Sequence, residues 1–181
     1  MFEVRSNQPE LMDDLSLSGD ALRKNLDELE VINRYLGGND VVTDALKRLV
    51  RNAPNWPEKT ISVADLGSGG GDLLRLMARW FRHRNLHAEL TGVDANAFMI
   101  TYAQEKSAAF SEIHYRQEDI FSEAFAREQY DIVCCSLFCH HFTDDALIDL
   151  FARMQRQARV AVIINDLHRH WLAYHSIRFL T

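Results

Sequence analysis

The sequence predicts an α/β protein with a doubly wound, mainly parallel β-sheet. From residue 60 onward, short apolar runs rich in β-branched residues alternate with segments in which apolar residues recur every three or four positions. A glycine-rich stretch at 67–71 follows the first of these runs and opens a helical segment. Strands that alternate with helices form parallel sheets with helices on both faces, and such sheets bind ligands at the carboxyl ends of their strands.

The apolar pattern also places the individual elements. Five strands are expected, over residues 61–66, 90–93, 113–116, 130–136 and 160–164. Helices are expected over 20–36, 40–52, 72–83, 96–110 and 168–180, and a further helix is expected to be capped by Thr143. A chain of 181 residues suffices for one domain. We expect residues 1–57 to form an N-terminal helical extension that acts as a lid, and residues 58–181 to form the core.

Composition and charge narrow the class of protein. The net charge is −6, whereas proteins that bind nucleic-acid backbones are usually basic, so no nucleic-acid partner is expected. The basic stretch 75–84 is interleaved with apolar residues and predicts an amphipathic helix with a solvated face. No apolar run reaches the length of a membrane span, and no secretory signal is expected. The three cysteines cluster at 134–139 and suit a reducing compartment, so a cytoplasmic protein is expected.

The glycine-rich stretch is the most informative segment. It has the spacing D-x-G-x-G-x-G, with Asp65, Gly67, Gly69 and Gly71 at the specified positions. Glycines let the backbone turn sharply and approach a ligand closely, because no Cβ intervenes. A dinucleotide fingerprint that started at Gly67 would need glycine or alanine at position 72, where this chain has Asp72. The acidic residue before the loop favours a cationic ligand.

This loop resembles the first motif of the class I, Rossmann-like methyltransferases, which use S-adenosylmethionine. The resemblance continues in order through 91–96, 117–120 and 130–142. It implies S-adenosylmethionine as the cofactor. The implied cofactor site comprises Asp65, Gly67, Ser68, Gly69, Gly71, Asp94, Ala95, Asp119, Ile120 and Ser136. In it Asp94 would accept hydrogen bonds from the ribose hydroxyls, Asp119 would accept from the adenine amino group, and the Ile120 backbone would address the ring.

Cysteines and histidines cluster at 134–141, and both are common zinc ligands. Cys134 and Cys135 are adjacent on a predicted strand, so their side chains should point to opposite faces of the sheet. The chain has no C-x-x-C pair, and cysteine also packs as a small apolar residue in cores. No metal site is therefore predicted.

The loop 137–142 resembles the loop after the fourth strand of small-molecule methyltransferases, which borders cofactor and acceptor. It lacks the D/N-P-P-Y sequence of members that methylate nucleobase amino groups. His140 or His141 is a candidate general base for a phenol or an enol, and the alternative is that each packs to hold the loop. Asp166, after the fifth strand, either orients the acceptor or caps the next helix.

The resemblance implies methyl transfer to an oxygen or carbon of a small organic acceptor, aromatic or lipid-like. Within the family, the chain resembles most the methyltransferases of ubiquinone and menaquinone biosynthesis. Family cores end with an antiparallel hairpin beside the fifth strand, whereas this sequence ends at Thr181, so either the hairpin has been removed or the protein is a shortened member. Two alternatives stay open: a cofactor-binding module or partner-dependent subunit without catalysis, and a nicotinamide-dependent oxidoreductase, which Asp72 disfavours. The oligomeric state is not predicted.

Overall fold

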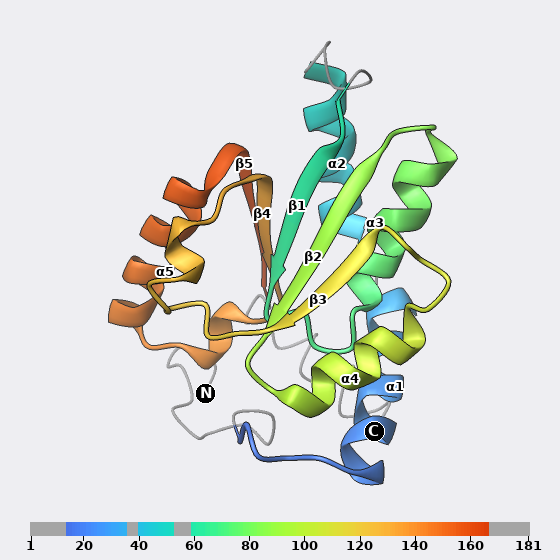
Figure 1. Cartoon of the computed structure of the whole chain (residues 1–181), viewed down its shortest axis with the longest axis vertical. Helices are drawn as coiled ribbons and strands as arrows, with labels where there is room; N and C mark the ends of the chain where they lie inside the picture. The colour runs from blue at the N-terminus through green and yellow to red at the C-terminus, as the bar shows by residue number, and fades with distance from the viewer. Residues whose placement is uncertain (1–13, 36–39, 53–58, 167–181) are drawn as a thin grey trace, which may run out of the picture.

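The computed structural model describes residues 14–35, 40–52 and 59–166. Their strands form one sheet in the order β3-β2-β1-β4-β5, and all neighbouring strands are parallel (Figure 1). The strands are β1 (Ile61–Leu66), β2 (Ala88–Asp94), β3 (Ile113–Gln117), β4 (Tyr130–Ser136) and β5 (Ala158–Asn165). The strand order reverses between β1 and β4, which is the switch point where doubly wound sheets bind ligands. The predicted fold class is confirmed.

The helices follow the predicted order, with small differences in length. They are α1 (Asp20–Tyr35), α2 (Asp40–Asn52), α3 (Asp72–His83), α4 (Ala97–Lys106) and α5 (Asp144–Gln157), together with the short 3₁₀ helices η3 (Phe125–Arg127) and η4 (Cys139–His141). As predicted, Thr143 caps α5, because its hydroxyl accepts from the Ala146 N–H. α4 ends before residue 110 because the Ser107 N–H bonds to two carbonyls of the last turn and the chain then turns back. The helix expected at 168–180 lies outside the described residues.

Two apolar cores cover opposite faces of the sheet. Leu46 of α2 and Phe81 of α3 belong to the first core, and Leu150 of α5 belongs to the second. The central strand β4 contributes to both, with Cys134 in the first core and Cys135 in the second. Both thiols are fully buried. The predicted opposite orientation of the two cysteines is therefore confirmed.

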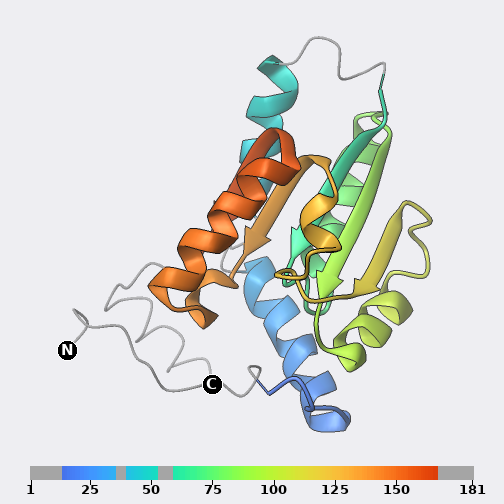
Figure 2. The ribbon, with the colours of Figure 1, turned by 60° about the vertical axis from the view of Figure 1, so that its left-hand side comes forward.

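Helix α1 lies beneath the carboxyl ends of the strands (Figures 1 and 2). Leu22 and Leu26 on its apolar face form a third, small core with Met99 and Tyr102 of α4. The Tyr102 hydroxyl donates to Asp27 Oδ1 at 2.7 Å. These contacts attach α1 to α4, and the side chains of Tyr102 and Leu26 lie beside Gly70 of the glycine loop.

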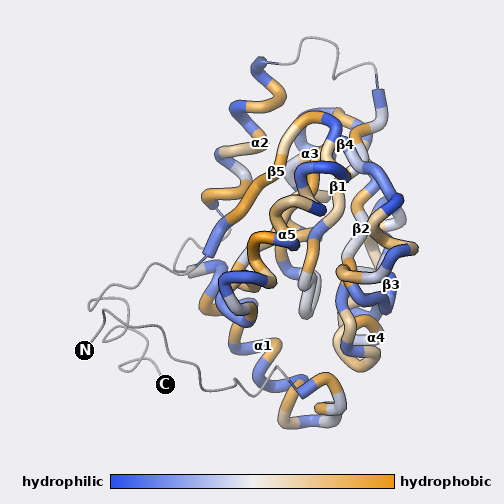
Figure 3. Tube along the Cα trace, turned by 90° about the vertical axis from the view of Figure 1, so that its left-hand side faces the viewer, coloured by the Kyte–Doolittle hydropathy of each residue, from blue (hydrophilic) through white to orange (hydrophobic). Residues whose placement is uncertain are grey.

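Helix α2 packs on the sheet through one apolar face. Apolar and polar positions alternate along it (Figure 3), as expected for a helix with one face in the core. Val42 and Leu46 are fully buried in the first core.

None of the described helices is both long and apolar enough to cross a bilayer.

Candidate functional site

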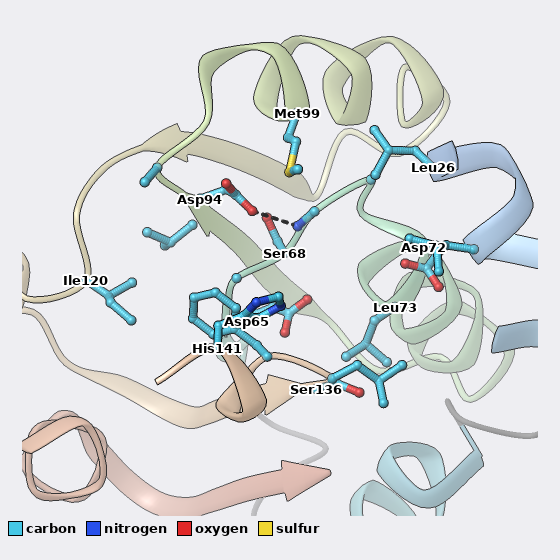
Figure 4. Close-up of a pocket in the computed structure, with 18 of the residues that line it drawn as sticks. Leu26, Asp65, Ser68, Asp72, Leu73, Asp94, Met99, Ile120, Ser136 and His141 are labelled. Atoms are coloured by element: carbon cyan, nitrogen blue, oxygen red, sulfur yellow. Dashed lines mark hydrogen bonds between the residues drawn. The ribbon is translucent and has the colours of Figure 1, made fainter. Parts of the chain in front are cut away.

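A cavity of about 730 Å³ opens at the carboxyl ends of the strands, at the switch point between β1 and β4. Residues 67–70 of the glycine loop line it. The end of β2, the segment 118–121, the loop 136–142 and helix α1 complete its wall. Figure 4 shows the labelled side chains converging on this space from elements that are distant in sequence. The sequence-predicted cofactor residues therefore meet in one place, except Gly71, which lies just beyond the lining.

The glycine loop adopts a conformation that ordinary residues avoid. Gly67, Gly69 and Gly71 all have positive φ angles, of 70°, 48° and 73°. A Cβ on Gly67 would lie 2.3 Å from the Phe138 ring, and a Cβ on Gly71 would lie 2.0 Å from the Tyr115 hydroxyl. Glycine is needed at these two positions for space as well as for backbone conformation.

Asp94 ends β2 and bonds directly to the glycine loop. Its Oδ2 accepts from the Gly69 N–H at 3.0 Å, and its Oδ1 accepts from the Asn96 N–H at 2.9 Å (Figure 4). Burial raises the pKa of Asp94, and the bonds from these two amides oppose the rise. The carboxylate is thus held against the loop, and Ala95 beside it also lines the cavity.

Asp65, the acidic residue before the loop, is buried in the cavity wall. Burial raises its pKa to about 8, the charge of Asp72 adds to the rise, and the Cys134 thiol, 3.6 Å from Oδ1, opposes it. The neighbouring Ser68 hydroxyl is buried and has no hydrogen-bond partner among the described residues. A buried carboxyl and an unpartnered hydroxyl at a cavity wall are suited to bind a polar, cationic ligand.

Replacing Asp65 with asparagine is expected to change how stability depends on pH. The pKa of this acid is 3.8 in the unfolded chain and about 8 in the fold. Between these two values the unfolded chain releases the proton and the fold keeps it, so the fold becomes less stable as pH rises from about 4 to about 8. Between pH 6 and pH 8 the wild type should lose about 2–3 kcal/mol of unfolding free energy through this group. Urea unfolding at both pH values should show a smaller loss of unfolding free energy in Asp65→Asn than in the wild type. Equal losses in the two proteins would contradict the raised pKa of Asp65.

The segment after β3 forms the opposite side of the cavity. Ile120 is buried and lines it, whereas Asp119 is exposed at its rim and accepts from the Phe121 N–H at 2.9 Å. Glu118 also lines the cavity and is paired with Arg116. Because β3 pairs with β2, this segment begins beside Asp94, whose backbone carbonyl accepts from the Glu118 N–H at 3.0 Å.

The structure pairs two residues that the sequence predicted only separately. His140 Nδ1 lies 2.7 Å from Asp166 Oδ1, and both side chains are mostly buried. Their loops meet because β4 and β5 are neighbours, with Ser136 opposite Asn165. An ionised carboxylate only accepts hydrogen bonds, so Nδ1 donates and Nε2 is the ring nitrogen that can take a proton. His140 lines the cavity, and Asp166 lies behind it, outside the lining.

The remaining predicted site residues support the same loop. The His141 ring lies 4.3 Å from the His140 ring and 5.8 Å from the Phe138 ring, and His141 also lines the cavity. The Ser136 hydroxyl accepts from the Asn165 side chain at 3.0 Å. Cys139, in the same loop, has its sulfur 3.5 Å from that of Cys135.

The sequence prediction for Arg75 was wrong. It was placed on a solvated face, yet it is 3% exposed and lines the cavity. Its Nη1 donates to the Gly70 carbonyl at 2.7 Å, and its Nη2 lies 2.8 Å from Glu30 of α1. The available signal was its position in the first turn of the helix that follows the glycine loop, where a side chain can reach the ligand edge. The rest of the stretch behaves as predicted, since Arg79, Arg82 and Arg84 are exposed.

The fold and the cavity define a doubly wound α/β protein with a cofactor-type site at its switch point. A sequence profile described as a methyltransferase domain matches residues 63–160, more than half of the chain. The chain belongs to this family of methyltransferase domains. No curated protein matches it in sequence.

Solved structures share the fold at low sequence identity. Magnesium protoporphyrin IX methyltransferase (ChlM) from Synechocystis PCC 6803 with bound S-adenosylmethionine is 20% identical, with a TM-score of 0.55 over 84% of this chain and 67% of that one. The plantazolicin methyltransferase BpumL, in complex with S-adenosylhomocysteine and a pentazolic plantazolicin analogue, is 22% identical, with a TM-score of 0.58 over 82% and 52%. The CurJ carbon methyltransferase is 17% identical, with a TM-score of 0.60 over 74% and 36%. The chain thus spans between about a third and two thirds of the length of these proteins.

Proposed function

We propose that this chain is an S-adenosylmethionine-dependent methyltransferase that acts on a small organic acceptor. The charge of the cavity wall carries the proposal. Six acidic residues of the described chain line the cavity, namely Glu30, Asp65, Asp72, Asp94, Glu118 and Asp119, and Asp65, with its pKa of about 8, adds its full charge only at alkaline pH. Arg75 is the one arginine or lysine among the described lining residues. Such a wall attracts a sulfonium and repels the two phosphates of a dinucleotide, so it favours this cofactor over a nicotinamide.

The residues present fit the cofactor. Asp94, tied to the loop by the Gly69 N–H, still has carboxylate lone pairs for the ribose hydroxyls. Ile120 offers an apolar surface to the adenine, with Asp119 at the rim for its amino group. The unpartnered Ser68 hydroxyl and the buried Asp65 carboxyl lie along the loop and supply polar contacts to the rest of the ligand.

When bound, S-adenosylmethionine supplies a methyl group that a nucleophile takes in an in-line displacement. The protein's part is to hold the acceptor in line and to exclude water from the site. Where the acceptor must lose a proton, His140 Nε2 accepts it, and the paired Asp166 stabilises the imidazolium that forms. This dyad favours a hydroxyl or an acidic carbon as the methylated group.

The acceptor side of the cavity is aromatic. The Phe142 ring contacts the rings of Phe138 and Phe121, with centroids 4.8 and 5.5 Å apart, and all three residues line the cavity. Stacked and edge-to-face contacts with such a wall favour a planar acceptor. An aromatic or lipid-like molecule fits it, including a quinol of the kind that the sequence resemblance implies.

Helix α1 acts in this proposal as a lid. Leu26, Glu30 and Asn33 face the cavity, and Asn33 donates to Asp72 of α3 at 3.1 Å. A lid that covers the cofactor excludes water during transfer.

The three cysteines of the chain are free thiols buried in the fold, which supports a cytoplasmic location.

A methyl-transfer assay tests the proposal. S-Adenosylmethionine and a panel of phenols, quinols and enols are incubated with the protein, and production of S-adenosylhomocysteine is measured. Acceptor-dependent production is expected. Binding of S-adenosylhomocysteine without turnover of any acceptor would instead favour a cofactor-binding module without catalysis.

A further inference from the structure

We propose that Arg75 is the receptor for the carboxylate at the amino-acid end of the cofactor. The inference rests on the proposed function, since it concerns the same cavity, and it assigns a residue that the motif pattern does not include. Arg75 lies in the first turn of α3, directly after the glycine loop. Its side chain is 4% exposed, and it lines the cavity.

The guanidinium is fixed in place by the loop itself. Nη1 donates to the Gly70 carbonyl at 2.7 Å and lies 3.5 Å from the Ser107 hydroxyl of the α4 C-terminus. The planar fork of an arginine holds its two Nη atoms in a fixed relation, so this anchor also fixes Nη2. Arg75 is therefore a preorganised donor.

The second nitrogen, Nη2, has donor capacity left for a ligand. It is buried and makes no hydrogen bond of adequate geometry among the described residues. Glu30 Oε2 lies 2.8 Å away, which makes an ion pair by distance but does not align with an N–H bond. The ion pair therefore leaves Nη2 without an aligned acceptor, and a buried donor of that kind is rare in folded proteins.

Charge identifies the group that Arg75 receives. The cofactor carries a sulfonium, an ammonium and a carboxylate, so it has one negative group to place in a wall of six acidic residues. Arg75 is the one cationic arginine or lysine of the described lining, and a carboxylate is the ligand that a guanidinium fork binds best. The α3 N-terminus adds a favourable dipole, although Asp72 and Glu30 beside it oppose an anion.

The place of α3 in the cavity agrees with a contact to the amino-acid end of the cofactor. Figure 4 shows Asp72 and Leu73, at the start of α3, on the side of the cavity opposite Asp94 and Ile120. If Asp94 and Ile120 hold the adenosine, the amino-acid chain of the cofactor extends toward α3. The aromatic rings proposed to meet the acceptor come from the segments after β3 and β4, whereas Arg75 comes from α3.

Two ligands distinguish this role from support of the glycine loop. S-Adenosylhomocysteine has the amino-acid chain, whereas 5′-methylthioadenosine lacks it but keeps the adenosine. By calorimetry, Arg75→Gln is expected to lower the affinity for S-adenosylhomocysteine about tenfold to a hundredfold, which is the range of a charged hydrogen bond. The affinity for 5′-methylthioadenosine should stay within about twofold of the wild-type value. Arg79→Gln, an exposed arginine of the same helix with its guanidinium over the Phe110 ring, is the matched control and should change neither affinity.

Equal losses for both ligands in Arg75→Gln would overturn the inference, because they would mean that Arg75 serves the loop through Gly70. A measurement on the wild type needs no folded variant. The decarboxylated analogue of S-adenosylhomocysteine should bind the wild type at least about tenfold more weakly than S-adenosylhomocysteine itself. Equal binding of the two would overturn the carboxylate receptor while leaving the proposed function intact. Failure of every adenosyl ligand to bind would overturn the proposed function itself.

Discussion

Replacing His140 with glutamine is expected to lower kcat for methyl transfer by about 10²–10⁴-fold, the usual contribution of a positioned general base. The reason is the 2.7 Å contact between His140 Nδ1 and Asp166 Oδ1, which fixes the tautomer and leaves Nε2 as the basic nitrogen. Steady-state kinetics with an acceptor that must lose a proton measures the effect. The affinity for S-adenosylhomocysteine should stay within about threefold, since the loss concerns proton transfer.

Two further variants test the dyad. Asp166→Asn keeps the shape of the carboxylate but removes its charge, so it should reproduce a large part of the loss in kcat. His141→Gln serves as the neighbouring control. The His141 ring lies 4.3 Å from the His140 ring, but Asp166 forms its hydrogen bond with His140. A His140→Gln enzyme with kcat within twofold of the wild type would show that the dyad only holds the loop.

Gly71→Ala is expected to lower the unfolding free energy by about 2–4 kcal/mol, from left-handed backbone strain together with overpacking. Gly71 has a φ of 73°, and a Cβ there would lie 2.0 Å from the Tyr115 hydroxyl. Tyr115 cannot move away freely, because its hydroxyl is 2.8 Å from the Ser107 hydroxyl. Urea unfolding monitored by circular dichroism measures the change.

Gly69→Ala is the matched control for this prediction. Gly69 also has a positive φ, of 48°, but nothing lies within 4 Å of its added Cβ. It should therefore lose only the backbone part, about 1–2 kcal/mol. Adding Tyr115→Phe to Gly71→Ala should cost less than the sum of the single changes, because it removes the clashing oxygen. Equal losses in the two glycine variants would mean that the contact with Tyr115 is relieved without cost.

Local sequence patterns were sufficient to predict much of the fold. The bounds of β1, β4 and α3 agree with the prediction. The two strands are compact apolar runs, and α3 is an amphipathic segment that begins directly after the glycine loop. The glycine loop and Asp94 were predicted from their spacing, and the structure adds the 3.0 Å bond between Gly69 and Asp94 that joins them.

Contacts between distant segments could not be predicted in this way. His140 and Asp166 are 26 residues apart, and their pairing depends on β4 and β5 being neighbours. The burial of Arg75 depends on α1 lying over the glycine loop, since Glu30 and the loop together cover its side chain. Helical periodicity describes which residues share a face, but it does not specify what a second helix places against that face.

The most direct test of the account is whether the cavity binds an adenosyl ligand. Calorimetry with S-adenosylhomocysteine should give a Kd in the micromolar range, about −8 kcal/mol, and NADH should give no heat. Asp94→Ala should weaken the adenosyl ligand by about 1–3 kcal/mol, because it removes the acceptor for the ribose hydroxyls. Tight binding of NADH, or no binding of S-adenosylhomocysteine to the wild type, would contradict the account.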